Sequence, residues 1–411
     1  MSHSKIITDL LGMQGWEIEK NGIEIEDDKV LVRIKRKAGI PFRCGECGDQ
    51  YLFAYDCAQE RIVRDFPIWG RQSWLIFREY RVNCVRCGVH VEKLDWLDKG
   101  QHQTLRYERY VAHLCDLLPV LDVAELEGLD KGTVYRLDKK WLRIRESQRV
   151  QYPVTYLGID EIAIKRGHKY ATVFYDLERR EVIGLVKGRK QRTVSHFFRR
   201  WGKQMCKQVV AVCMDLWAAY RNSVILHCRN AAVVFDKFHV YSYLSTAIDE
   251  VRRIEQNKAT AEGREIIKGS RWLWLKASRN LRRNESRRLE AIIALNQNLQ
   301  KAYLLKEDFE QFYASPNAES AEQFLKEWIE RCRESKLKPF AKLAKRIWRW
   351  AEGILAYFTH RITNAVSEGI NNKIKVLKRR SYGFHDHEYF FLKILNITGA
   401  LPEFKYFNHD F

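Results

Sequence analysis

Alternating apolar and polar residues near the start of the chain predict β-strands. The stretch GIEIEDDKVLVRIKRK, residues 22–37, alternates in this way on both sides of a Glu-Asp-Asp turn. A period of two is typical of strands with one buried face. We therefore expect residues 1–100 to form a small domain of short strands.

Residues 101–150 change to apolar residues at helical spacing and contain the pattern of a helix-turn-helix. Asp130 can cap the second helix by accepting a backbone N–H near Thr133. That helix carries five cations, so we expect it to bind DNA; a helical hairpin that only links two domains is the alternative. The small residue, turn glycine and buried aliphatic of the pattern are Ala124, Gly128 and Val134, and the cations are Lys131, Arg136, Lys139, Lys140 and Arg143.

Residues 151–248 contain apolar runs separated by short polar breaks, which predict strands. Three antiparallel strands are followed by a helix, a strand, a short helix and a strand. This is the order of the ribonuclease H-like fold, an α/β fold with a mixed sheet flanked by helices. The five predicted strands cover 154–164, 170–177, 181–188, 208–215 and 231–240, with a turn at 165–168 between the first two. Residues 249–350 are almost entirely helical in pattern.

Two Cys-x-x-Cys pairs, each followed by a glycine, lie in the predicted N-terminal domain. A two-residue spacer closes a tight turn on a metal ion, and the glycine permits backbone geometry that other residues resist. Residues 48–83 separate the pairs, more than the roughly 15 to 20 residues of the commonest zinc pattern, so further structure must lie between them. We expect one Zn²⁺ on four thiolates; unrelated turns or a redox pair are the alternatives. The ligands are Cys44, Cys47, Cys84 and Cys87, with Cys57 and His90 as second choices.

The net charge of the chain points to a polyanionic partner. Lys and Arg number 72 against 52 Asp and Glu, a formal net charge of +20. Nucleic acid is the first candidate. A membrane is less favoured, because no stretch approaches the roughly 20 apolar residues of a spanning helix. The N-terminal residues lack the pattern of a signal peptide, so we expect a cytoplasmic, nucleoid-associated location.

Two aspartates occupy positions where apolar residues would be expected. Asp160 lies inside the run 156–164, and Asp215 ends the run 209–214. An ionised carboxylate in apolar surroundings costs several kcal/mol unless a partner holds it. In a ribonuclease H-like sheet the first and fourth strands are neighbours, so these carboxylates would converge. With a third acid they can hold two Mg²⁺ (or Mn²⁺) ions. A capped or paired structural role is the alternative for each.

The third acid is predicted at the head of a cationic helix near the end of the chain. Glu368, Asn372, Lys375 and Arg379 are spaced so that they share one helical face. The carboxylate would complete the metal site, and the cations would hold a DNA strand against it. A surface acid that favours the helix dipole is the alternative for Glu368. The cations after it are Lys373, Lys375, Lys378, Arg379 and Arg380.

Cations interleaved with tryptophans suggest a second nucleic-acid contact at residues 264–288, which hold nine cations and two acids. Such residues can grip phosphates and stack an unpaired base. Arg271, Trp272 and Trp274 lie there, and Trp217 follows Asp215 closely enough to contact a base near the scissile bond. Tryptophans that only pack, beside a solvated cationic face, are the alternative.

Four stretches together resemble the DDE transposases of bacterial insertion sequences, in particular the insertion-sequence L-three family. They are GIDEIAIKRGHKYATVFYDL, VCMDLWAAY, VVFDKFHV and NAVSEGINNKIKVLKRRSYGF. The resemblance covers nearly the whole chain. It implies a zinc ribbon, a helix-turn-helix, and a ribonuclease H-like core interrupted by a large all-helical insertion before the last acid. The implied catalytic, metal-binding acids are Asp160, Asp215 and Glu368; Asp236 and His239 are implied as a further site feature, and Glu161 and Asp176 are second choices.

The resemblance also implies an activity: cleavage of double-stranded DNA at the terminal inverted repeats, then strand transfer into target DNA by a two-metal mechanism. A homo-oligomer on DNA is expected, because two ends must be brought together. A structure-selective nuclease and a DNA-binding regulator derived from a transposase are the alternatives. The expected domains are zinc-binding, 1–100; helix-turn-helix, 101–150; catalytic core, first part, 151–248; helical insertion, 249–350; and core, last part, 351–411.

Overall fold

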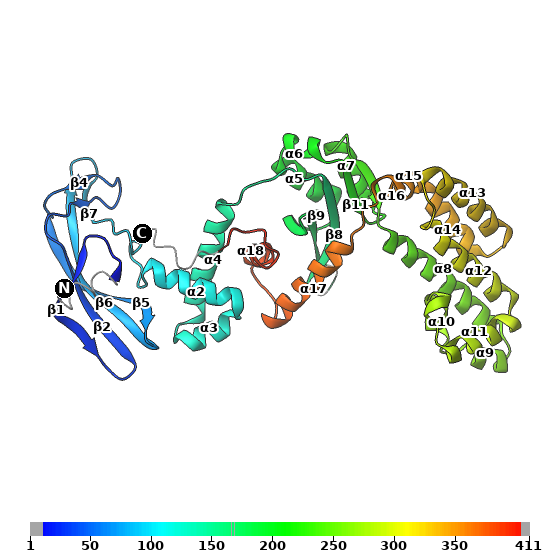
Figure 1. Ribbon diagram of the computed structural model, residues 1–411, viewed down its shortest axis with the longest axis horizontal. Coiled ribbons are helices and arrows are strands. Elements are labelled where there is room, and N and C mark those ends of the chain that lie inside the picture. The colour runs from blue at the N-terminus through cyan, green and yellow to red at the C-terminus, as the bar shows by residue number, and fades with distance from the viewer. Residues whose placement is uncertain (1–10, 166, 168, 404–411) are drawn as a thin grey trace. The chain divides into compact units, whose positions relative to one another are not determined.

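The computed structural model describes residues 11–165, 167 and 169–403 (Figure 1). The chain divides into two compact units. The first comprises Met1–Arg149, Lys378–Ile397 and Leu401–Phe411, and the second comprises Val150–Leu377 and Thr398–Ala400. The C-terminal helix α18 (His387–Ile397) therefore belongs with the N-terminal part of the chain.

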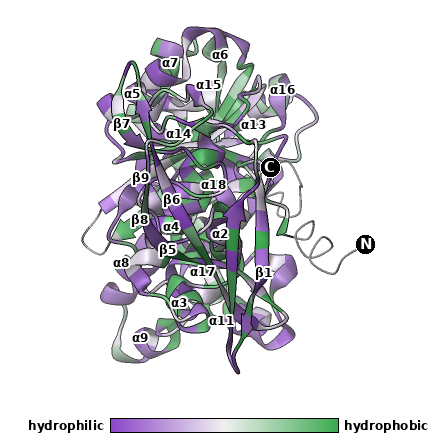
Figure 2. Ribbon diagram, turned by 90° about the vertical axis from the view of Figure 1, so that its left-hand side faces the viewer, coloured by the Kyte–Doolittle hydropathy of each residue, from purple (hydrophilic) through white to green (hydrophobic). Residues whose placement is uncertain are grey.

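A twisted sheet with strand order β1-β2-β6-β5 forms the N-terminal part of the first unit, and β7 pairs with β6. The strands predicted on either side of the Glu-Asp-Asp turn are present as β1 and β2, which pair antiparallel. Apolar and polar residues alternate along these strands, visible as bands of two colours in Figure 2. The strands of this sheet are β1 (Trp16–Ile25), β2 (Lys29–Arg36), β5 (Asp56–Ile68), β6 (Arg71–Cys84) and β7 (Gly88–Val91); β3 (Phe42–Arg43) and β4 (Gln50–Tyr51) form a separate two-stranded sheet.

Three helices follow and confirm the predicted local geometry: α2 (Leu105–Leu117), α3 (Val120–Glu127) and α4 (Lys131–Ser147). Ala124 and Val134 are buried between them. Gly128 ends α3 in the left-handed region, with φ 63°, where a side chain would be strained. Asp130 caps α4, its carboxylate accepting from the Gly132 backbone N–H at 2.8 Å.

Helix α18 packs against α4 through a buried ion pair. The Lys393 ammonium lies 3.0 Å from Oδ2 of Asp138 and donates to the carbonyl oxygen of Cys115 at 2.6 Å. The Tyr389 hydroxyl donates to the same carboxylate oxygen of Asp138. All of these side chains are buried. Helix α18 is thus tied to both α2 and α4.

The second unit contains a five-stranded sheet with the order β10-β9-β8-β11-β12. The first three strands are antiparallel, whereas β8, β11 and β12 run parallel. The predicted adjacency of the first and fourth strands is therefore confirmed. The elements are β8 (Tyr156–Lys165), β9 (Lys169–Asp176), β10 (Glu181–Lys187), α5 (Gln191–Trp201), α6 (Lys203–Gln208), β11 (Ala211–Met214), α7 (Ala218–His227) and β12 (Ala232–Phe235).

Two features of this sheet differ from the sequence pattern or fall outside the description. The fifth strand was predicted to reach residue 240, which is wrong, because β12 ends at Phe235 and Asp236 is the N-cap residue of helix α8. In the predicted turn at 165–168, residues 166 and 168 lie outside the described residues.

A helical segment joins β12 to α17 (Ala365–Arg380), the predicted cationic helix. It packs around a core of large side chains that is continuous with the core of the sheet, including Trp328, Phe309 and Phe340. Within the described residues no helix has the length and apolar character to span a membrane. The segment contains α8 (Lys237–Lys258), α9 (Ala261–Ile267), α10 (Arg271–Leu275), a 3₁₀ turn (Ser278–Asn280), α11 (Arg283–Leu295), α12 (Gln297–Phe312), α13 (Ala318–Glu334), α14 (Lys338–Arg349), α15 (Ala351–Leu355) and α16 (Tyr357–His360).

Candidate functional site

The two strand aspartates lie at equivalent positions of neighbouring parallel strands. Ile159 of β8 pairs with Met214 of β11, and each is followed directly by an acid, Asp160 or Asp215. Parallel strands in register carry equivalent side chains in the same direction. The sheet therefore sets the two carboxylates at the same level of adjacent strands.

Helix α17 donates two hydrogen bonds to the Asp160 carboxylate. Oδ2 of Asp160 accepts from the Ser367 hydroxyl at 3.1 Å and from the Asn371 amide at 2.9 Å. The buried Tyr175 hydroxyl donates to Oδ1 of Asn371 at 2.8 Å, which fixes the amide orientation. Burial, and then the charge of Asp215, raise the pKa of Asp160 to about 6.

Asp236 and His239 lie at the start of α8. Nε2 of His239 is 2.7 Å from Oδ1 of Asp215. This contact raises the pKa of His239, because the carboxylate favours the protonated imidazole. Asp236 is buried, and burial raises its pKa. Of the predicted pair Asp236 and His239, His239 is thus in contact with Asp215.

The start of α17 is fixed to the sheet by Asn364. Its side-chain amide donates to the carbonyl oxygen of Ile159 at 3.1 Å, and its backbone N–H lies 3.4 Å from Oδ1 of Asp236. Sequence reasoning did not identify Asn364, Ser367 or Asn371. Their spacing of three and four residues places them on one helical face, a polar stripe that could have been noticed.

Glu368 directly follows Ser367, lies off this polar stripe and is exposed in the first turn of α17. Its position brings it to the same end of the sheet as the two aspartates, since its neighbour Ser367 contacts Asp160. The ligand atoms of Asp160, Asp215 and Glu368 do not all lie within 4.8 Å of one another. Among the described residues, the cysteine cluster is the one group of three or more potential ligands whose ligand atoms all lie within 4.8 Å of one another.

The second-choice acids have other partners. Glu161 points away from Asp160 and pairs with Arg189, whose Nη1 is 3.1 Å from Oε1. Asp176 is buried and accepts the backbone N–H groups of residues 178 and 179, which closes the turn after β9. Trp217 is partly exposed, and Arg189 lies over its ring at 5.1 Å.

Comparison with known families agrees with this arrangement. The transposase model of the ISL3 family matches residues 157–394, more than half of the chain, and the helix-turn-helix domain of transposase family ISL3 matches residues 92–142. The chain belongs to the ISL3 family of transposases. The predicted resemblance to the insertion-sequence L-three family is thereby confirmed.

Curated relatives resemble this ISL3-family chain along nearly its whole length. The transposase for insertion sequence element IS1001 of Bordetella parapertussis is 33% identical over 96% of this chain and 98% of its own. The transposase for insertion sequence element IS1557 of Mycobacterium tuberculosis is 27% identical over 98% of this chain and 97% of its own. The same values hold for the IS1557 transposases of two strains.

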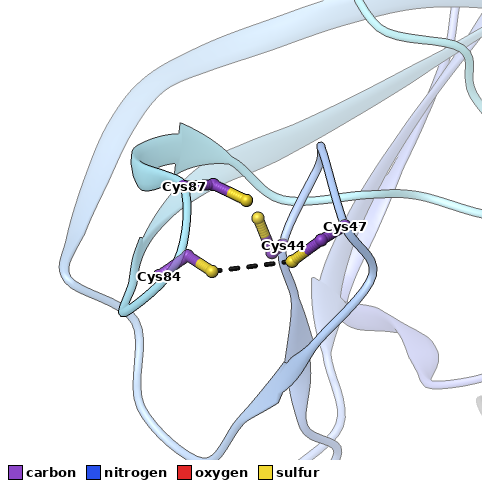
Figure 3. Close-up of side chains that lie close together, drawn as sticks. All are labelled: Cys44, Cys47, Cys84 and Cys87. Carbon is purple, nitrogen blue, oxygen red and sulfur yellow. Dashed lines mark hydrogen bonds between the residues drawn. The ribbon is translucent and has the colours of Figure 1, made fainter.

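The four predicted cysteines of this family member form one cluster (Figure 3). The Sγ atoms of Cys47 and Cys84 are 3.5 Å apart, and all four sulfurs lie within 4.8 Å of one another. The first pair is carried by the β3–β4 hairpin and the second by the β6–β7 turn. The β5–β6 hairpin accounts for the long separation between the pairs.

The glycines after the two cysteine pairs have the predicted backbone geometry, whereas the two second-choice ligands lie outside the cluster. Gly48 and Gly88, which follow the two pairs, have φ values of 81° and 83°, the left-handed geometry expected of them. Cys57 is exposed and outside the cluster. His90 is also outside it, with Nε2 2.7 Å from the carbonyl oxygen of Cys87.

Three of the five cations predicted to bind DNA on α4 are held by acids. Lys139 lies 2.5 Å from Oδ2 of Asp386 and 2.9 Å from Oε2 of Glu388, and Arg143 makes a two-pronged contact with Glu388. Lys140 pairs with Asp98 and with the buried Glu108. Lys131 and Arg136 are exposed in the first two turns.

The two tryptophans of residues 264–288 differ in their exposure to solvent. Trp274 is fully buried and donates from Nε1 to the Ser270 hydroxyl at 2.9 Å, so it is a packing residue that cannot stack a base. Trp272 is exposed, and Arg271 lies over its ring at 5.5 Å. Several cations of this stretch are paired with acids: Lys268 with Glu265, Lys276 with Glu285 and Arg279 with Glu310.

The cations of α17 lie on its solvent side. Lys373, Lys375, Arg379 and Arg380 are exposed, as is Asn372, which accepts from Lys375 at 3.3 Å. Lys378 is half-buried. Arg380 donates to the carbonyl oxygen of Leu117 at 2.6 Å, so this last cation also contacts α2.

Proposed function

We propose that this chain cleaves DNA at the ends of its insertion sequence and transfers the freed 3′ strands into target DNA. The observation that carries the proposal is that Asp160 and Asp215 directly follow Ile159 and Met214, which pair with each other in adjacent parallel strands. The strand order β10-β9-β8-β11-β12 supports a ribonuclease H-like core. The helical segment between β12 and α17 corresponds to the proposed insertion.

The residues at this end of the sheet fit divalent cations. Asp160, Asp215 and Glu368 are the proposed ligands, and all offer the hard oxygen atoms that Mg²⁺ or Mn²⁺ prefers. Two strand carboxylates at one level also need a cation to offset their mutual repulsion. Bound there, two metal ions would supply an activated water and stabilise the leaving oxygen of the phosphodiester.

The protein's own side chains would position this chemistry. Ser367 and Asn371 fix the orientation of the Asp160 carboxylate, and Tyr175 fixes Asn371. His239 holds Asp215. Preorganised carboxylates need no rearrangement at the moment of reaction, which favours in-line displacement at phosphorus. The exposed cations of α17, beside Glu368, would hold the DNA backbone.

The first unit would recognise the DNA ends. We propose that the cysteine cluster binds one Zn²⁺, because sulfurs about 2.3 Å from a tetrahedral ion lie about 3.8 Å from one another, close to the spacing seen here. In α4, Lys131 and Arg136 at the helix start would enter the major groove. Two chains would be needed to bring two ends together, so a homo-oligomer on DNA is proposed.

We expect the purified protein, with Mg²⁺ or Mn²⁺ and a labelled duplex that carries the terminal repeat, to nick at the repeat and join the freed strand to a second duplex. Products separated on a denaturing gel would show both steps. Nicking without joining would favour the alternative of a structure-selective nuclease. Tight binding without nicking would favour a regulator and overturn the proposal.

Replacing Cys84 by Ser is expected to remove the bound zinc. A tetrahedral structural site closed by four thiolates loses most of its affinity when one ligand is lost, because its binding free energy in small domains is on the order of 10 kcal/mol. Metal analysis of the purified protein should find about one zinc per wild-type chain and almost none in the variant.

Cys57→Ser is the matched control for the zinc site, because Cys57 lies in the same domain but outside the cluster. It should retain its zinc. Equal zinc loss in both variants would mean that the cluster is not the binding site.

A further inference from the structure

Helix α14 presents an exposed face that is rich in cations and has no acid. Its sequence, KPFAKLAKRIWR, has five cations and no acid. All five are exposed, and the face also includes the partly exposed Trp348. The cations are Lys338, Lys342, Lys345, Arg346 and Arg349.

Four of these cations form a straight row. Residues 338, 342, 345 and 349 are separated by four, three and four positions, the spacing that keeps side chains on one side of a helix. At 1.5 Å per residue the row is about 16 Å long. One DNA strand has a phosphate every 3.4 Å along the axis, so the row spans about five phosphates.

The opposite face of α14 fixes the direction of this row. Phe340, Leu343 and Ile347 are buried, and they pack the helix against α8 and α13. In Figure 1 these three helices lie together within the helical segment. The cations therefore cannot turn inward without exposing the apolar face to water.

The row is not neutralised by the protein. Among the described residues, none of the five cations has an acidic partner within 4.0 Å; Arg346 lies instead over the ring of Tyr243 at 4.4 Å. The neighbouring helix α13 differs, because its exposed cations are paired with acids. These pairs are Lys326 with Glu322, Arg331 with Asp308, and Arg333 with Glu330.

We propose that the exposed face of α14 binds the phosphate backbone of duplex DNA. Unpaired cations at regular spacing on a fixed helix match a regular row of phosphates, whereas ion-paired cations must first lose their partners. The inference rests on the proposed action on DNA and adds a sequence-independent contact outside the metal site and outside α4. It also moves the DNA contact of the helical segment from residues 264–288 to α14.

The test measures DNA binding against salt concentration. Fluorescence anisotropy of a labelled duplex would be recorded with the full chain, without added magnesium or manganese, between about 50 and 200 mM salt. Each lost phosphate contact lowers the slope of log K against log salt by about 0.9. The double variant Lys342→Gln with Lys345→Gln should therefore lower the slope by nearly two units.

The matched control is Lys326→Gln with Arg333→Gln on α13, which removes the same net charge from paired positions. Its slope should stay within about half a unit of wild type. A second variant of the row, Lys338→Gln with Arg349→Gln, repeats the test at its two ends. Circular dichroism would confirm that each variant is folded.

Two results would overturn the inference. One is a salt slope that changes equally in the variants of the row and in the α13 control, or that changes in neither double variant of the row. The other is a variant of the row that binds DNA like wild type but no longer binds vesicles of phosphatidylglycerol and phosphatidylcholine. This result would mean that the α14 face binds lipid rather than DNA. Because no cleavage is measured, the proposed chemistry could fail while this DNA contact stands, and the reverse.

Discussion

Replacing Asp215 by Ala is expected to lower the rate of DNA-end cleavage at least about a thousandfold, with DNA binding almost unchanged. The Asp215 carboxylate is one of two that the sheet sets side by side, and it is the partner of His239. Its loss would remove a proposed metal ligand and leave Asp160 without its counterpart. Single-turnover cleavage of a labelled terminal duplex measures the rate, and anisotropy measures the binding.

Glu161→Gln is the matched control for this active-site prediction. Glu161 follows Asp160 directly, but it pairs with Arg189 rather than with α17. It should retain cleavage within about tenfold of wild type, because a partly exposed ion pair contributes little. Cleavage that survives Asp215→Ala, or that disappears in Glu161→Gln instead, would place the active site elsewhere.

Replacing Lys393 by Met is expected to destabilise the first unit by about 3 to 5 kcal/mol. The variant would leave the buried Asp138 carboxylate with the Tyr389 hydroxyl but without its cation. Asp138 is buried, so water would not replace the lost ammonium. Thermal unfolding should show a melting temperature lower by roughly 10 °C.

The double variant Lys393→Met with Asp138→Asn tests whether the buried charge is the cause. Asparagine keeps an oxygen that accepts from Tyr389, and it carries no charge. Most of the lost stability should return. If the single variant melts like wild type, α18 does not pack on α4 in solution through this ion pair.

The fold around the candidate site was predictable because its signals are local. The apolar run that contains Asp160 and the run that Asp215 ends each predict a strand, and the order of elements predicts that those strands are neighbours. Cys-x-x-Cys-Gly needs only a tight turn and a left-handed glycine. Asp130 and Gly128 likewise act within a few residues of their own positions. Apart from the strand order, each of these features depends on contacts close in sequence.

Other features depend on partners far away in sequence, which no pattern reveals. Arg143 pairs with Glu388, and a cation of α4 therefore looked free when it was not. Trp272 and Trp274 both suit stacking by composition, yet one is buried and the other exposed. Helical spacing also left the contact face of α17 undetermined, because a shift of one residue, from Glu368 to Ser367, selects a different face.

The ion pairs between α4 and α18 divide α4, the proposed DNA-binding helix, into two parts whose residues differ in how freely they can change. Lys139 and Arg143 both pair with Glu388 of α18, so their replacement would remove contacts to that helix. Lys131 and Arg136, in the first two turns, are exposed and form no ion pair with the described residues of α18. We expect related transposases to diverge most at these early positions, so that a lineage can follow changes in its own terminal repeats through a few substitutions without losing its architecture.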